Sequence, residues 1–145
     1  MEVILPLGSE GAPLGATLQA NLRRSEEDAE RLAKAGVHVR LVKGAYVEAP
    51  DVARPYGEET DLAYVRLAHR LAESGVRLAL ATHARPLREA LLRALPDAEC
   101  ELLFGVRSEE AEKLARRGRT VRLYLPFGAG WFRYWMRRVA ESRGA

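Results

Sequence analysis

The sequence has 145 residues, of which 48% are hydrophobic and 30% are charged, a balance that excludes a wholly disordered or collagen-like chain. The length fits one ordinary domain or part of a larger one. Lysine and arginine (23) exceed aspartate and glutamate (20) only slightly and are spread along the chain, so the charge does not indicate a nucleic-acid partner. The single cysteine, Cys100, excludes an internal disulfide. We therefore expect a reducing, cytoplasmic setting and no metal site.

The first third of the chain predicts two strands separated by a helix. Residues 1–13 are rich in glycine and proline and are expected to be irregular. A short strand follows at residues 16–20, and a helix begins at Ser25, which has the character of an N-cap. Residues 37–42 alternate at period two and predict a strand. Residues 43–57 are expected to form a long loop.

The rest of the chain continues the alternation of helix and strand. The helix expected at residues 58–74 has a hydrophobic stripe that includes Leu62 and Leu71. The further strands are expected at residues 76–81, 99–104 and 120–125. The further helices are expected at residues 85–95, 108–117 and 131–142. Strands that are each followed by a helix predict an α/β fold of parallel βα units, either as an open doubly wound sheet or as five of the eight units of a (β/α)8 barrel.

Polar or small residues follow each expected strand, at the positions where parallel α/β proteins bind ligands. These strand-end positions are Gln19, Arg40 with Lys43 and Gly44, Thr82 with His83, Leu103 with Gly105, and Tyr124. Arg40 is unusual because a guanidinium interrupts a strand of alternating valine and leucine, and such a charge needs an anionic or electron-rich partner if it faces inward. A Thr-His pair after a strand is, by contrast, most often a helix cap and a surface histidine.

The last expected helix places four polar side chains at three- and four-residue steps along one side. These are Tyr134, Arg137, Arg138 and Glu141. One interpretation is a solvated Arg–Glu face, which contributes little to stability. The other is a pair of guanidinium groups that binds a small carboxylate. The spacing alone leaves both interpretations open.

Taken together, these segments resemble the proline dehydrogenase family of FAD-dependent enzymes. The resemblance is carried by six stretches, at residues 18–24, 39–48, 81–83, 101–107, 121–128 and 134–141. It implies a distorted (β/α)8 barrel, of which residues 14–145 would form five consecutive βα units with the N-terminal units missing. Phe127 stands where many members of the family have tyrosine.

The resemblance also implies roles for individual residues. FAD would contact Gln19, Arg40, Val42, Lys43, Gly44, Ala45, Thr82 and His83, with Arg40 as the catalytic group. L-proline would lie in a pocket of Leu103, Tyr124 and Tyr134, with its carboxylate on Arg137 and Arg138 and with Glu141 beside them. Tyr134 favours proline over hydroxyproline. Because Cys100 has no place in this chemistry, we expect it to be a buried small residue.

The reaction implied by the resemblance is oxidation of L-proline to Δ1-pyrroline-5-carboxylate in proline catabolism, with a quinone as electron acceptor. Because the implied acceptor is a membrane quinone, the expected cytoplasmic protein would be peripheral at the inner face of the membrane. The absence of the family's first strands predicts a truncated or split enzyme, completed by a partner chain or accompanied by self-association. The alternative is a non-catalytic remnant that binds a partner chain or flavin without turnover. A nucleic-acid-binding module is disfavoured because the basic residues follow the flavin enzyme's pattern.

Overall fold

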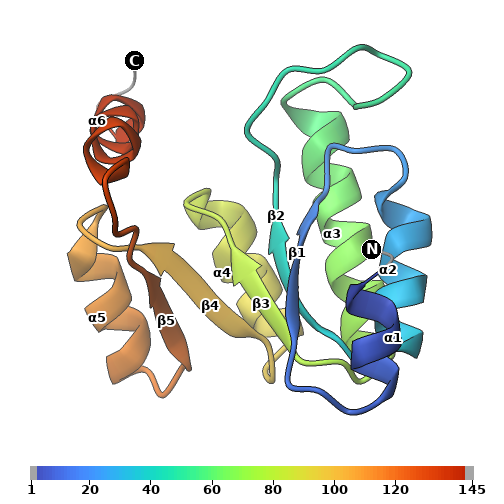
Figure 1. Ribbon diagram of the computed structural model, residues 1–145. Coiled ribbons are helices and arrows are strands. Elements are labelled where there is room, and N and C mark those ends of the chain that lie inside the picture. Colours follow the sequence, from blue (N-terminus) through green and yellow to red (C-terminus); the bar gives the residue numbers. More distant parts are fainter. Residues whose placement is uncertain (1–2, 143–145) are drawn as a thin grey trace. The chain divides into compact units, whose positions relative to one another are not determined.

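The computed structural model describes the backbone of residues 3–142 and side chains as far as residue 136. The chain divides into two compact units, residues 1–99 and residues 100–145. The described elements alternate between helix and strand in chain order (Figure 1): α1 (Ile4–Ser9), β1 (Gly15–Gln19), α2 (Ser25–Lys34), β2 (His38–Val42), α3 (Glu58–Glu73), β3 (Leu78–Ala81), α4 (Arg85–Ala94), β4 (Glu99–Leu103), α5 (Ser108–Arg116), β5 (Val121–Tyr124) and α6 (Trp131–Ser142). The predicted α/β class and its parallel strands are confirmed.

Helix α1 is the one described element that the sequence did not predict, because residues 1–13 were expected to be irregular. The helix is short and contains Pro6, which is tolerated there because the first turn of a helix has no internal partners for its N–H groups. Its Gly8 is buried, and a Cβ at that position would collide with the Val37 side chain. The helix therefore forms where glycine allows its backbone to approach the chain just before β2.

The sheet of the first unit consists of β1, β2 and β3 in that order, all parallel. Burial alternates along β1 and β2, as a half-covered sheet requires. Ala16, Leu18, Val39 and Leu41 are buried on the face that packs against α2 and α3. On the opposite face, which we call the open face, the side chains of Thr17, Gln19, Arg40 and Val42 are exposed or half-buried.

The predicted buried stripe of helix α3 is confirmed in the second half of the helix but is wrong near its beginning. Leu62 was expected to be buried but is 48% exposed, whereas Thr60 and Tyr64 are fully buried. Both polar residues satisfy their hydroxyl groups inside the core: Thr60 Oγ1 donates to the Pro55 carbonyl (2.7 Å) and Tyr64 Oη donates to the Leu41 carbonyl (3.1 Å). The hydrogen bonds make these residues as suitable for the core as a leucine.

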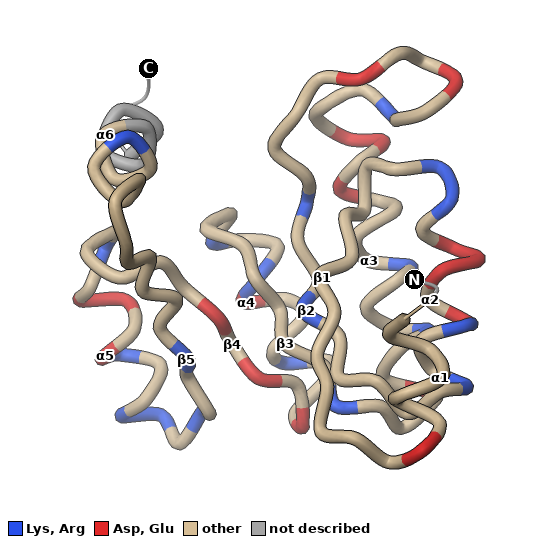
Figure 2. Tube along the Cα trace, viewed as in Figure 1, with Lys and Arg blue, Asp and Glu red and all other residues tan. Residues whose placement is uncertain are grey.

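The second unit contains β4 and β5, which pair in parallel, with α5 packed on β5. Cys100 is buried in β4, as expected for a small residue without a chemical role. In β5 and the following segment, by contrast, Leu123, Leu125 and Phe127 are exposed. Acidic and basic positions are scattered over the elements of each unit and form no single basic tract (Figure 2). Within residues 3–142, no helix combines the length and apolarity that a membrane crossing requires.

Candidate functional site

The carboxyl ends of the first unit's strands form a rim that gathers several predicted site residues. Gln19, Val42 and Ala81 lie side by side in the sheet register, at the last position of β1, β2 and β3. Thr82 follows directly after β3. Arg40 lies two residues before the end of β2 on the same face as Gln19 and Val42, one layer deeper in the sheet. A guanidinium on an open sheet face below a polar rim suits an anionic or electron-rich ligand.

The chain after β2 turns sharply at Gly44. Its φ of +112° lies in a region that other residues avoid, and a Cβ there would collide with the buried side chain of Asn21. Just before it, Lys43 Nζ lies 2.5 Å from Asp61 Oδ1. Ala45 is exposed. The glycine therefore lets the chain pass close to Asn21, which brings Lys43 and Ala45 to the rim.

The Thr82–His83 turn is held from inside the protein. Thr82 is buried, and its Oγ1 accepts a hydrogen bond from the Ala84 N–H (3.1 Å) just before α4. Arg88 of α4 is only 2% exposed and donates through Nη1 to the Thr82 carbonyl (3.3 Å). His83 is half-buried beside this turn. Thr82 thus stabilises the turn before α4 and is not the helix cap that its sequence context favoured, because the N-cap position of α4 is Ala84.

The beginning of α2 also contacts the rim, although not by the predicted cap. Ser25 was expected to be the N-cap, but it is the first helical residue, and its Oγ donates to the Gln19 carbonyl (2.6 Å) instead. Arg24 precedes the helix, and the hydrogen bond and the negative charge of Asp28 raise the pKa of Arg24 above its usual value. The serine hydroxyl thus fixes the end of β1 from below.

The second unit brings together three of the residues predicted for a substrate pocket. Leu103 and Tyr124 are register partners at the ends of β4 and β5. The ring of Tyr134, in α6, lies 6.0 Å from that of Tyr124. The side chains of Arg137, Arg138 and Glu141 lie outside the part of the protein that the structure describes.

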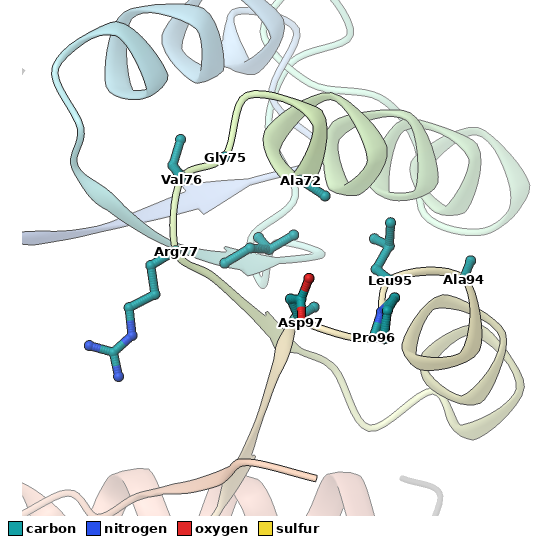
Figure 3. A pocket seen from close by; sticks show the side chains of 10 residues that line it. Ala72, Gly75, Val76, Arg77, Ala94, Leu95, Pro96 and Asp97 are labelled. Carbon is teal, nitrogen blue, oxygen red and sulfur yellow. The ribbon is translucent and has the colours of Figure 1, made fainter.

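A hollow of about 340 Å³ lies at the opposite end of β3 from the rim (Figure 3). It is lined by the ends of α3 and α4 and by the residues that precede β3, and Arg77 points away from it. Arg77 is instead bound to Glu99, with 2.6 Å between Nε and Oε1. Because ligands of parallel α/β proteins gather at the carboxyl ends of the strands, this hollow is not the candidate site.

Three residues that shape the rim were not predicted from the sequence. Asn21 and Arg88 are buried polar side chains, and Arg54 crosses from the long loop to the end of β1. An asparagine directly after a strand was an available signal, because such residues often organise turns. Nothing in the local sequence distinguishes Arg54 or Arg88 from the many surface arginines.

Comparisons with known proteins give one consistent family. The sequence model of the family described as proline dehydrogenase matches residues 7–145. The chain is 38% identical to proline dehydrogenase 1 of Bacillus subtilis over 135 residues, which are 88% of this chain and 45% of the relative. It is 35% identical to the proline dehydrogenase of Deinococcus radiodurans over 144 residues, which are 94% of this chain and 46% of the relative.

Among solved structures, the chain is similar to proline utilization A of Bdellovibrio bacteriovorus, inactivated by N-propargylglycine. The two agree with a TM-score of 0.81 at 25% sequence identity, over 97% of this chain and 18% of the other. The chain thus spans less than half the length of its curated relatives and a small part of this structural neighbour.

Proposed function

Because the chain belongs to the proline dehydrogenase family, we propose that it provides the flavin- and proline-binding part of an enzyme that oxidises L-proline to Δ1-pyrroline-5-carboxylate. The observation that carries this proposal is the rim, where Gln19, Val42 and Gly44 come together above Arg40. In this proposal, residues 14–145 are five consecutive βα units of a (β/α)8 barrel whose N-terminal units are missing, and residues 1–13 lie outside them.

The residues of the first unit fit a flavin such as FAD. On the open face the side chains of Gln19, Arg40 and Val42 are half-buried, and Gly44 keeps the backbone next to the rim free of a side chain. Gln19, Val42, Lys43, Gly44, Ala45, Thr82 and His83 would hold the cofactor. A bound flavin would supply the redox chemistry by accepting a hydride from C5 of proline, and loss of a proton from the ring nitrogen would complete the C5=N bond of the imine product.

Arg40 is the proposed catalytic residue of this site. Its guanidinium group lies on the open face, one layer below Gln19 and Val42. A fixed positive charge next to a bound flavin would favour the electron-rich reduced ring.

The proposed substrate pocket belongs to the second unit. Leu103, Tyr124 and Tyr134 would surround the apolar carbons of proline, and the nearness of the two tyrosine rings supports this part of the proposal. Arg137 and Arg138 would bind the carboxylate in two-pronged fashion and thereby orient C5. Glu141 would lie beside them.

The proposed partners follow from the proposed reaction and from exposed apolar surface. The electrons would pass to a quinone, and the protein would be cytoplasmic and peripheral at the inner face of the membrane. The remaining barrel units would come from another chain or be replaced by self-association. The exposed apolar side chains of Leu123, Leu125 and Phe127 support an uncovered surface that such a chain would bury.

Kinetics of arginine variants test this proposal, in a complex that restores the missing barrel half. We expect Arg137→Met and Arg138→Met each to raise the KM for proline by about ten- to a hundredfold, because each loses a charge-assisted contact worth ~1.5–3 kcal/mol. Flavin content should not change. Arg40→Met should have the reverse effect and lower flavin retention or turnover more than proline affinity.

The outcomes distinguish the proposal from its alternative. Unchanged KM in both variants would mean a solvated arginine face and no carboxylate site. A complex that binds flavin but never turns over proline would indicate a non-catalytic remnant. A complex that binds no flavin at all would overturn the assignment of the rim.

A further inference from the structure

The long segment at residues 43–57 begins and ends against the same short stretch of chain. At its beginning, the Ala20 N–H donates to the Val42 carbonyl (2.8 Å) and the Asn21 N–H donates to the Lys43 carbonyl (2.9 Å). Near its end, the Arg54 N–H donates to the Asn21 carbonyl (2.7 Å). Loops of this length without regular structure are commonly either disordered or functional. This one is fixed at both ends to the residues that follow β1.

The side chain of Arg54 completes this attachment. Its Nη1 donates to the Leu22 carbonyl (3.1 Å) and to the Ala20 carbonyl (3.4 Å), and its Nη2 donates to Glu26 Oε1 (3.0 Å). The Arg54 side chain is 17% exposed, whereas that of Glu26 is 45% exposed. One planar guanidinium therefore binds two backbone carbonyls and the first turn of α2. The single ammonium group of a lysine lacks this fork of donors.

These contacts lie directly behind the rim. Ala20 immediately follows Gln19, and Asn21 is the residue whose side chain contacts Gly44 and donates through Nδ2 to the Tyr46 carbonyl (3.4 Å). A shift of the loop would therefore move Gly44 relative to the end of β1.

We propose that Arg54 is a positioning residue, which holds the loop of residues 43–57 on the β1–α2 connection and so sets the spacing between Gln19 and Lys43–Ala45. In this role it touches no ligand itself. The inference rests on the proposed function for its ligand, a flavin, but the hold on the loop is a property of the chain alone.

The first measurement is hydrogen exchange on the full chain, with Arg54→Met compared with the wild type. The Arg23 N–H donates to the Val52 carbonyl (3.0 Å), so its exchange reports on the loop. We expect its protection to fall by about tenfold or more, as hydrogen bonds to a charged group are worth ~1.5–3 kcal/mol. Protection of the buried Leu41 amide in β2 should stay unchanged, which shows that the unit remains folded.

Two further variants make the comparison specific. Arg70→Met is the matched control. It removes the same charge from an exposed ion pair between Arg70 of α3 and Glu30 of α2 (3.2 Å). This variant should leave the exchange protection of the Arg23 amide at its wild-type value. Arg54→Lys keeps the positive charge but loses the fork of donors. Protection of the Arg23 amide in this variant should therefore lie between the values for the wild type and for Arg54→Met. If Arg54→Met exchanges like Arg70→Met, the proposed hold on the loop is wrong.

The second measurement is a titration with FAD, in the complex that restores the missing barrel half. Arg54→Met should raise the Kd for FAD by about tenfold, with the KM for proline unchanged at saturating flavin. An unchanged Kd together with faster loop exchange would overturn the positioning role. If the wild-type complex binds no FAD, the proposed function fails, and the exchange data still decide whether Arg54 holds the loop.

Discussion

The strands of the two units differ in how far their apolar side chains are buried. In the first, the inward strand residues Val39 and Leu41 are completely buried by the unit's own helices. In the second, Leu123 of β5 is 51% exposed and Phe127 is 92% exposed. The strands of the first unit are therefore covered by its own helices, whereas β5 and the segment after it leave successive apolar side chains exposed.

The two units also differ in how their polar side chains are buried and hydrogen-bonded. The first unit fixes its rim with buried polar residues such as Asn21, Thr82 and Arg88, and each of them is hydrogen-bonded to backbone. In the described part of the second unit, Arg116 forms an exposed ion pair with Glu112. We infer that the predicted cofactor rim is preorganised, because buried hydrogen-bonded groups hold a backbone more firmly than exposed ion pairs do.

The largest expected effect is on core stability. Leu41→Ala should lower the free energy of unfolding by about 2–5 kcal/mol, because it opens a cavity under α3. Leu123→Ala, the same substitution on the exposed face of the second unit, should cost less than about 1 kcal/mol. Urea denaturation of both variants measures the contrast. Equal losses would show that Leu123 is covered in solution, and the comparison of the two units would then fail.

The next effect concerns two glycines with positive φ. Gly44 (+112°) and Gly128 (+96°) share the backbone strain that any side chain would meet, about 1–3 kcal/mol. A Cβ at Gly44 would also collide with Asn21, whereas a Cβ at Gly128 meets open space. Gly44→Ala should therefore destabilise the protein by about 1–3 kcal/mol more than Gly128→Ala. Thermal unfolding of the pair tests this, and equal shifts in Tm would contradict the close packing of the rim.

Arg88 provides a smaller effect of the same kind. Arg88→Met removes the donor to the Thr82 carbonyl and leaves a buried acceptor without that bond, which should cost about 1–3 kcal/mol. Arg116→Met in the second unit should cost about 0–1 kcal/mol, because its pair with Glu112 is exposed. Urea denaturation again gives both values. If Arg116→Met proves the more damaging, the inferred difference in order is wrong.

The sequence predicted the strands well because alternation is a local property. The pattern of residues 37–42 is enough to assign Val39 and Leu41 to one face and Arg40 to the other, and the structure agrees. The buried stripe of α3 was harder, because Thr60 and Tyr64 become core residues only through distant carbonyl partners. Hydrophobicity alone assigned Leu62 to that stripe instead.

At the candidate site, too, the local sequence pattern does not show contacts between residues that are distant in the sequence. The strand-end rule located Gln19 and Thr82 on the rim without any knowledge of partners, whereas Val42 came only from the family resemblance. Arg54 escaped prediction because the groups it binds lie about thirty residues away in the sequence, and a loop arginine normally faces solvent. The roles of Arg137 and Arg138 stay predictions, since their side chains lie outside the described residues.

The smallest expected effect on stability comes from the most exposed aromatic side chain. Phe127→Ser should change the free energy of unfolding by less than about 0.5 kcal/mol, because the ring has few contacts to lose. It should nevertheless reduce self-association of the isolated chain, since burying a phenylalanine at an interface contributes about 1.5–3 kcal/mol. Sedimentation velocity over a range of concentrations measures this, with Val47→Ser, an exposed position of the first unit, as the matched control. If only the Phe127 variant associates more weakly, the surface that mediates self-association belongs to the second unit. Equal association in the wild type and both variants would mean that the exposed apolar side chains of β5 and the following segment do not drive self-association. The contrast between the two units would then have no effect on assembly.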